Sequence, residues 1–269
     1  MRGSKKPPGG RVCSRSGSLV GRKTNGASSN VGYEIMIARA QLGKALLFSM
    51  SVLFAMASLH PAVAANRDGL RVLVESCLDP VTAGDGSKCP APVTGESDSI
   101  NEARCKATTD VWAKSTEFVA IRDRKMCGCP RGFEHGLAMP LALISGVEAD
   151  NTPEGIWQFA WDVARKRISD TNLIALAVNS RLQRSQDHLH IHIVQLLKEA
   201  RSDFPQGSTV TVDNLEHVWA VAKTFAKEKS MPDYGVLVVH GPGDKFTVVV
   251  ADGAWAHSPE KDYTYYQCQ

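Results

Sequence analysis

Three histidines stand at alternate positions in the second half of the chain. They are His188, His190 and His192, and each is followed by a leucine or an isoleucine. Successive side chains of a β-strand point to opposite faces, so we expect a surface strand with all three imidazoles on one face and the aliphatic side chains buried on the other. Packing alone explains such a row poorly. We therefore interpret it as a functional site.

Two kinds of chemistry could use this histidine row. Three imidazoles are a sufficient ligand set for zinc, although same-face residues lie about 7 Å apart along a strand, and three on a flat strand share one ion less comfortably than two. The other chemistry is nucleophilic attack on phosphorus by the central ring. Neutral imidazole is nucleophilic near pH 7, and a phosphorylated imidazole is reactive enough to be hydrolysed.

The elements that must position the row are predicted from hydrophobic periodicity. Apolar residues at helical spacing predict a helix over 68–78, and Thr152-Pro153-Glu154 predicts the start of a second helix that carries Trp157 and Trp161. A third helix is expected over 215–229, with Asp213 as its cap. Loops are expected over 79–115.

Apolar runs predict the strands of one sheet. Their expected ranges are 117–122, 135–143, 173–178, 188–196, 234–240 and 246–251. The first two form a hairpin-like pair across the polar connection 123–134, and the last two form a hairpin across Gly241–Lys245. Short connections between strands argue for an antiparallel sheet with packed helices, which is an α+β fold.

Charge is distributed unevenly along the chain. The formal net charge is +3, yet residues 1–44 hold nine basic residues and one acidic residue, a balance of +8 that leaves −5 for the rest. An acidic body makes a nucleic-acid groove driven by bulk charge unexpected. With 43% hydrophobic and 22% charged residues, the chain is also unlike collagen, a wholly disordered protein or a polytopic membrane protein.

The N-terminal quarter divides into two segments ahead of the main domain. Residues 1–35 read as a basic arm, either disordered or an over-long start. Residues 36–65 have a positive beginning, an uncharged apolar run and Ala62-Val63-Ala64, which is typical of a signal peptide. The 21 uncharged residues from Ala45 to Ala65 could also just span a bilayer as a retained anchor. Both interpretations predict export, and 66–269 is then the working domain.

Six cysteines follow the arm, and an even number in an exported chain predicts up to three disulfides. Cys77 and Cys89 flank a loop rich in Pro, Gly and Asp, and are the easiest local pair. The other four allow three connectivities, although Cys127 and Cys129 are too close in sequence to favour bonding to each other.

The row and its surroundings resemble a known family. His188–Val194 is similar to the His-φ-His-φ-His-φ-φ signature of the histidine-triad superfamily, and the segments 118–123 and 135–140 resemble the first strand pair of that superfamily. The segment 177–192 resembles the CDP-diacylglycerol pyrophosphatase family in particular. So do the helix with two tryptophans, the early cysteine pair, the late Gln267-Cys268 and the N-terminal hydrophobic segment. The chain departs from the family at Cys105 and at Cys127-Gly128-Cys129.

The resemblance implies a histidine-triad-like antiparallel sheet and roles for individual residues. His190 is the expected nucleophile, and protonated His188 and His192 orient it and contact the phosphate oxygens without a metal or other cofactor. Substrate contacts are expected from Asn179, Arg181, Ser185, Gln186, Asp123 and His135, with further charge from Arg184.

The implied activity is hydrolysis of CDP-diacylglycerol to CMP and phosphatidate through a cytidylyl-histidine. Its substrate is a liponucleotide at a membrane surface, with no nucleic acid as partner and a homo-oligomer left open. The expected location is a bacterial inner membrane, facing the periplasm, or the periplasm itself after signal cleavage. The alternatives are a histidine-triad hydrolase of soluble nucleotides and a periplasmic protein that binds zinc through His188, His190 and His192.

Overall fold

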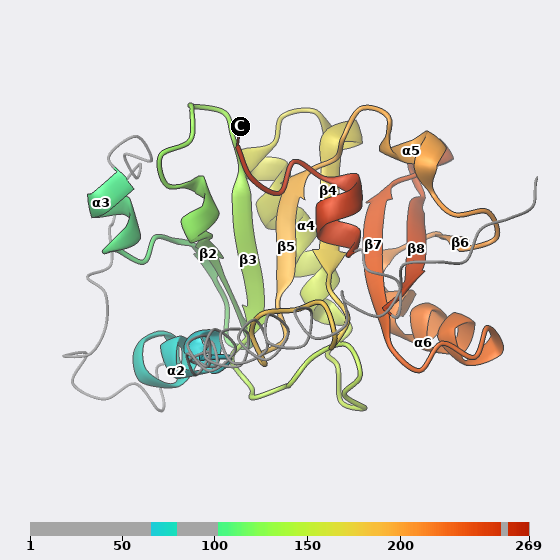
Figure 1. The fold of residues 1–269 in the computed structure, drawn as a ribbon, viewed down its shortest axis with the longest axis horizontal. Helices are drawn as coiled ribbons and strands as arrows, with labels where there is room; N and C mark the ends of the chain where they lie inside the picture. The colour runs from blue at the N-terminus through green and yellow to red at the C-terminus, as the bar shows by residue number, and fades with distance from the viewer. Residues whose placement is uncertain (1–65, 80–101, 254–257, 269) are drawn as a thin grey trace, which may run out of the picture. The chain divides into compact units, whose positions relative to one another are not determined.

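The sheet that carries the histidine row is antiparallel throughout and has helices on both faces (Figure 1). We describe it from a computed structural model, which describes residues 66–79, 102–253 and 258–268. These residues belong to one unit that spans Ala64–Gln269. The predicted α+β class is confirmed.

Eight strands form the sheet in the order β1-β2-β3-β5-β4-β7-β8-β6. They are β1 (Val111–Lys114), β2 (Phe118–Arg122), β3 (His135–Pro140), β4 (Ile174–Val178), β5 (Ile191–Gln195), β6 (Thr209–Val212), β7 (Tyr234–His240) and β8 (Phe246–Asp252). The two predicted hairpins are confirmed as the β2–β3 and β7–β8 pairs. The short strands β1 and β6 were not predicted, and each lies at one edge of the sheet.

One face of the sheet is covered by α4 (Gly155–Arg167) and α6 (Val218–Glu228). Their apolar sides and the inward side chains of the central strands form the largest core cluster, in which the rings of Trp157 and Trp219 lie 4.7 Å apart. Trp161 belongs to the same cluster, so both tryptophans of the predicted helix, Trp157 and Trp161, are core residues.

The other face carries two separate apolar clusters. Near β2 and β3, Val74 and Leu78 of the π-helical turn η2 (Val74–Leu78), which continues α2 (Gly69–Leu73), pack on the sheet. Near β4 and β7, α5 (Ala200–Asp203) and Tyr263 of α7 (Pro259–Tyr263) form the second cluster. Between the apolar residues of these clusters, this face carries the polar side chains of His135 on β3 and His192 on β5. A further helix, α3 (Glu102–Lys106), lies within the predicted loop 79–115.

The expectation of a surface strand over 188–196 was wrong at its start. β5 begins at Ile191, so His188 and His190 precede the strand, and all three rings of the row are buried. The strand pairing stops here because Pro140, at the end of the neighbouring strand β3, has no backbone N–H to donate. Its carbonyl oxygen accepts a hydrogen bond from the side chain of His188 instead, at 3.0 Å from Nε2. The backbone N–H of Leu189 donates to Ile144, beyond the end of β3.

Two predicted helix caps also differ from the structure. The residue before α4 is Glu154, whose carboxylate accepts from the backbone N–H of Trp219 on α6 rather than capping α4. Asp213 forms an ion pair with Lys245 at 2.8 Å, and Asn214 caps the turn that precedes α6. Both Glu154 and Asp213 are thus engaged by residues that are distant in sequence, which sequence reasoning could not foresee.

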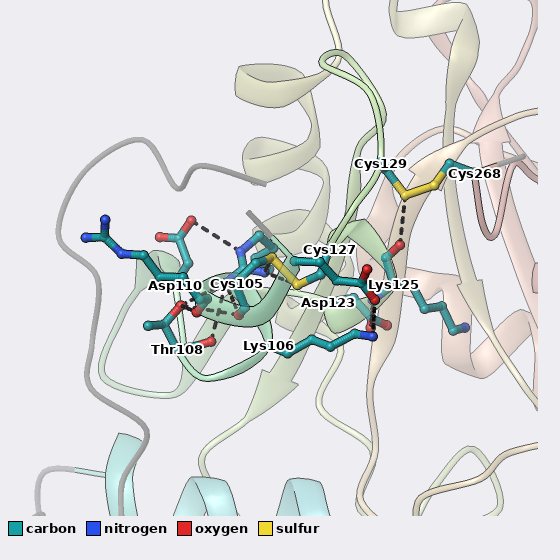
Figure 2. Close-up of a disulfide and its surroundings, with 12 residues drawn as sticks. Cys105, Lys106, Thr108, Asp110, Asp123, Lys125, Cys127, Cys129 and Cys268 are labelled. Atoms are coloured by element: carbon teal, nitrogen blue, oxygen red, sulfur yellow. Dashed lines mark hydrogen bonds and ion pairs between the residues drawn. A yellow bond between two sulfur atoms is a disulfide. The ribbon is translucent and has the colours of Figure 1, made fainter. Parts of the chain in front are cut away.

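Two disulfides hold the connection between β2 and β3 (Figure 2). Cys105–Cys127 ties it to α3, and Cys129–Cys268 ties it to the C-terminal segment. Cys77 is also disulfide-bonded, and its partner lies outside the described residues, as does its predicted partner Cys89. Both disulfides therefore join segments that are separated in sequence, by 22 and 139 residues.

Several predictions concern residues outside the described ranges. The basic arm 1–35 and the signal or anchor segment 36–65 both lie there. Within the described ranges, no helix is long and apolar enough to cross a membrane. Export and anchoring stay predictions.

Gly136 on β3 should be intolerant of a side chain. A Cβ atom there would lie 2.1 Å from the ring of Trp112, which in turn lies against the guanidinium of Arg167 at 4.6 Å. We expect Gly136→Ala to lower the free energy of unfolding by about 1–3 kcal/mol because the ring must move. Gly155→Ala is the matched control, since its Cβ would make only ordinary contacts and should change stability by less than about 1 kcal/mol. Equal urea-unfolding midpoints for the two variants would contradict this account.

Candidate active site

An open pocket of about 520 Å³ lies between α2 and the polar part of the sheet. Its polar wall includes His190, His192 and Ser185, and its apolar wall includes Leu70 and Leu73 of α2. The pocket is also lined by Asp123, Arg124, Lys125, Gln186, Val72, Ile121 and Leu137. A pocket of this volume, with a few convergent polar groups, is typical of a small-molecule site.

His190 is oriented for attack on a bound group. Its Nδ1 donates to the carbonyl oxygen of His188 at 2.6 Å, so Nε2 carries the lone pair of the neutral ring. Burial lowers the pKa of His190 below the ordinary histidine value, and the bond to the carbonyl of His188 opposes this only in part. The residue therefore presents a neutral, nucleophilic nitrogen in a site whose pocket it lines.

The surroundings of His188 differ from those expected of a phosphate ligand. Its ring is bonded to Pro140, and it is not among the residues that line the pocket. Burial lowers the pKa of His188 to about 4, so the ring is neutral near pH 7 rather than a protonated phosphate ligand. His188 thus positions His190, because its side chain fixes the local backbone and its carbonyl fixes the tautomer of the nucleophile.

His192 belongs to a buried polar network. Its Nδ1 lies 3.0 Å from Nε2 of His135, whose Nδ1 donates to the carbonyl oxygen of Tyr266 at 2.9 Å. Burial lowers the pKa of both rings, so both are neutral. Neutral His135 then accepts at Nε2 from His192 Nδ1–H, which leaves the lone pair of His192 on Nε2. The predicted protonated form of His192 is not the form that this environment favours.

Two carboxylates adjoin the same pair of rings. Glu260 Oε1 lies 3.3 Å from His192 Nδ1 and pairs with the ammonium group of Lys125. Asp123 Oδ2 lies 3.4 Å from His135 Nε2. The structure therefore brings together two of the predicted substrate-binding residues, Asp123 and His135, although His135 is fully buried and supports His192 instead of lining the pocket.

Asn179 also lies within this network rather than in the pocket. Its Nδ2 donates to Glu260 Oε2 at 2.8 Å and lies 3.5 Å from His192 Nε2. The side chain is buried and does not line the pocket, so the expected bond to ribose or phosphate is not supported. It holds Glu260 and His192 relative to each other.

The turn before the row contributes two of its predicted residues to the pocket. Ser185 is exposed along its wall, and Gln186 accepts from the backbone N–H of Leu70 at 3.0 Å and donates to the carbonyl of Asn66 at 3.1 Å. Gln186 thus holds the start of α2 against the site. A Cβ on Gly69 would lie 2.9 Å from the same Gln186 oxygen, so α2 approaches closely there.

The two predicted arginines lie elsewhere. Arg181 lines a second pocket of about 410 Å³ together with Arg67 and Asp187. Arg184 is buried, and its guanidinium is bonded to Glu148 at 2.6 and 2.8 Å and to Asp187 at 3.1 Å. Neither arginine lines the histidine pocket, so the turn does not supply the expected positive charge.

Sequence reasoning missed the residues that supply that charge. Arg124 and Lys125 line the pocket from the turn η3 (Arg124–Met126), whose start is capped by Asp123. A basic pair directly after Asp123, the residue that follows the predicted strand 117–122, was the available signal. Glu260 was missed as well, although Ser258-Pro259-Glu260 is a typical helix start and Ser258 caps α7. The carbonyl of Tyr266 left no signal in the sequence.

The histidine row is not a ligand set for a single ion. Among the described residues, the one group of three or more ligating side chains close enough to hold a metal consists of Asp123, His135 and His192. His188 and His190 direct one nitrogen each to a backbone carbonyl. The alternative of zinc bound by the three row histidines is thereby corrected.

Most residues of the site lie in a segment that matches a known protein family. Residues 101–220 match the family model described as CDP-diacylglycerol pyrophosphatase. This is a family of hydrolases that act on a pyrophosphate bond. The matched segment contains the histidine row, Asp123 and His135, and it ends before α7. The predicted resemblance to this family is confirmed over that segment.

A structural comparison adds little to this match. The crystal structure of a DUF4931 family protein from Bacillus cereus ATCC 10987 aligns with 11% identity and a TM-score of 0.38, over 56% of this chain and 88% of that protein. A score of this size carries no argument about fold or activity. Placement in the histidine-triad superfamily stays a prediction from the row itself.

Burial of neutral His188 should make stability depend on pH. The pKa of this ring is 6.5 in a model peptide and about 4 in the folded protein. The folded state therefore binds a proton less readily than the unfolded state, so the contribution of the neutral ring to the free energy of unfolding is fully present above pH 6.5 and is lost as the pH falls towards 4. Between pH 7 and pH 4, we expect the free energy of unfolding of His188→Gln to fall by about 3 kcal/mol less than that of the wild type. Urea unfolding at stepped pH measures the slope, and His217→Asn, on an exposed position, should keep the wild-type slope. The same slope in His188→Gln and the wild type would contradict the assignment.

Proposed function

We propose that this protein hydrolyses the pyrophosphate of CDP-diacylglycerol through a covalent intermediate on His190. The observation that carries the proposal is the neutral His190 ring, whose Nδ1 is bonded to a backbone carbonyl while the residue lines a pocket with two cations. Arg124 and Lys125 suit the negative charge of a pyrophosphate. The family match over residues 101–220 supports the same substrate.

In the first step, His190 Nε2 attacks the phosphorus on the cytidine side. A P–N bond forms, the bridging P–O bond breaks, and its electron pair leaves with the phosphate of phosphatidate. The ring becomes cationic, which strengthens the short Nδ1–H bond to the carbonyl of His188. Arg124 and Lys125 are placed to stabilise the charge that develops on the phosphate oxygens.

In the second step, water attacks the same phosphorus and breaks the P–N bond, so CMP leaves and His190 regains its lone pair. The network of His192, His135 and Glu260 adjoins this position and offers neutral nitrogen and carboxylate acceptors for the proton of the water. The rings of His190 and His192 have centroids 4.9 Å apart, which places the network beside the reacting ring.

The apolar wall suits the lipid part of the substrate. Leu70, Val72 and Leu73 face the pocket from α2, and Val72 is half exposed. α2 also begins four residues after the predicted signal or anchor segment 36–65. We therefore propose that the protein is exported and acts at the surface of a bacterial inner membrane, where a liponucleotide is presented with its headgroup in water.

The covalent route can be tested with substrate labelled in the cytidine-side phosphate. Wild-type protein quenched during turnover should carry label that is acid-labile and alkali-stable, as expected for a phosphoramidate. His190→Asn should carry none, and its turnover should fall by about 10³-fold or more. His217→Asn, at an exposed histidine outside the pocket, should label and turn over as the wild type does. Turnover of His190→Asn at the wild-type rate would overturn the mechanism, and faster hydrolysis of a soluble CDP-alcohol than of the lipid would overturn the substrate.

The source of positive charge can be tested by a matched pair of arginines. Arg124→Gln removes a cation that lines the histidine pocket, and we expect kcat/KM for CDP-diacylglycerol to fall about 10- to 100-fold. Arg181→Gln removes a cation from the separate pocket and should change kcat/KM by less than about threefold. The reverse ranking would restore the role first expected of Arg181 and argue against the pocket described above.

A further inference from the structure

Four side-chain atoms from three separate parts of the chain converge beside the pocket. They are His135 Nε2, His192 Nδ1, Asp123 Oδ2 and Glu260 Oε1. The two nitrogens lie 3.0 Å apart, and Asp123 Oδ2 and Glu260 Oε1 lie 3.4 and 3.5 Å from His135 Nε2. Glu260 Oε1 lies 3.3 Å from His192 Nδ1.

These separations, four of the six within the set, are close to those between ligand atoms of a tetrahedral metal site, and Asp123, His135 and His192 all have ligand atoms within 4.8 Å of one another. Nitrogen and carboxylate oxygen bind zinc at about 2.0–2.1 Å, so two ligand atoms at a tetrahedral angle lie about 3.3 Å apart. All four measured separations lie within a few tenths of an ångström of that value. A two-histidine, two-carboxylate set is also of the kind that binds Zn²⁺ or a similar divalent transition metal.

The surroundings hold the ligands in the orientation that a metal needs. His135 Nδ1 donates to the carbonyl oxygen of Tyr266, which directs the lone pair of Nε2 at the cluster, and such an outer bond is usual for a metal-binding histidine. The disulfide Cys129–Cys268 ties the segment that carries Tyr266 to the connection after Asp123. Asp123 and His192 both line the pocket, so an ion has a route from solvent.

Two groups compete with a metal for these atoms. The hydrogen bond between the two rings must give up its proton, and the ammonium group of Lys125 is paired with Glu260 Oε1. Lys125 is more than a third exposed along its side chain, so it can withdraw into the pocket at little cost. A divalent ion would also neutralise the negative charge of Asp123 and Glu260, which the single positive charge of Lys125 balances only in part.

We propose that Asp123, His135 and His192, with Glu260 as fourth ligand once Lys125 withdraws, form a binding site for one Zn²⁺ ion or a similar divalent transition metal. The site is distinct from the row of three histidines, since it uses only His192 of that row and takes His135 from β3. Zinc binding here depends on ligand geometry and does not require the pyrophosphatase activity.

The test is a calorimetric titration of Zn²⁺ into metal-stripped, full-length protein, with Co²⁺ as a spectroscopic probe of coordination. We expect one ion per chain for the wild type at this site, with visible absorption of tetrahedral Co²⁺. Asp123→Asn and His135→Gln should each weaken binding by about 100-fold or more, because even outer partners of a metal site are worth 10- to 100-fold. Asp123→Asn keeps an oxygen to cap η3, where Asp123 Oδ1 accepts from Lys125, so it also guards against loss of fold.

His190→Gln is the matched control, because it removes a neighbouring imidazole that is not a ligand in this site. Its affinity for Zn²⁺ should stay within about threefold of the wild type, as should that of His217→Asn. Loss of binding in His190→Gln with retention in Asp123→Asn would assign the ion to the row and overturn the proposal. The absence of Zn²⁺ binding to the folded wild type would overturn it as well. Neither result bears on the covalent labelling of His190, so the two proposals fail separately.

Discussion

The need to keep four buried imidazoles neutral and hydrogen-bonded governs the arrangement of this site. His135, His188, His190 and His192 are all buried, and a charged ring in that environment would lack the solvation that water provides. Three of the rings donate one N–H to a backbone carbonyl, those of Tyr266, Pro140 and His188. Each carbonyl settles which nitrogen keeps the proton, and so which nitrogen has the free lone pair. The nucleophilic nitrogen of His190 is a consequence of this constraint.

The C-terminal segment completes the site from far along the chain. α7 supplies Glu260, and the residues after it supply the carbonyl of Tyr266. A bridge between Leu196 and Thr264 and the disulfide Cys129–Cys268 attach this segment to the end of β5 and to the connection after β2. The disulfide thus stabilises the segment that carries the outer partners of His135 and His192.

The site has an uncharged part, formed by the imidazoles, and a positively charged part at the pocket wall. The four imidazoles are neutral, so the positive charge suited to an anionic pyrophosphate comes from Arg124 and Lys125 at the pocket wall. Arg184, which lies closer to the row in sequence, is committed to Glu148 and Asp187 and stabilises the turn. The acidic body of the chain is consistent with this local arrangement, because two cations in one pocket attract an anion without a basic surface.

The sequence alone determined the central elements and pointed to the residue that we propose as nucleophile. Period-2 alternation and apolar runs were sufficient for the two hairpins and for β4, and the unusual spacing of His188, His190 and His192 indicated both a site and a family. The edge strands β1 and β6 were not predicted, because they are short and only half buried and their hydrophobic pattern is weak.

Only the tertiary structure decided how the residues divide their work. Whether His188 touches substrate depends on Pro140 of another strand, and whether Asn179 binds ribose depends on Glu260, which lies 81 residues away. Such contacts leave no local pattern, because a hydrogen bond across a sheet depends on where two distant segments meet and not on their spacing along the chain. The same holds for the four atoms of the proposed zinc site. Their types are visible in the sequence, but the 3.0–3.5 Å between them exists only in the folded chain.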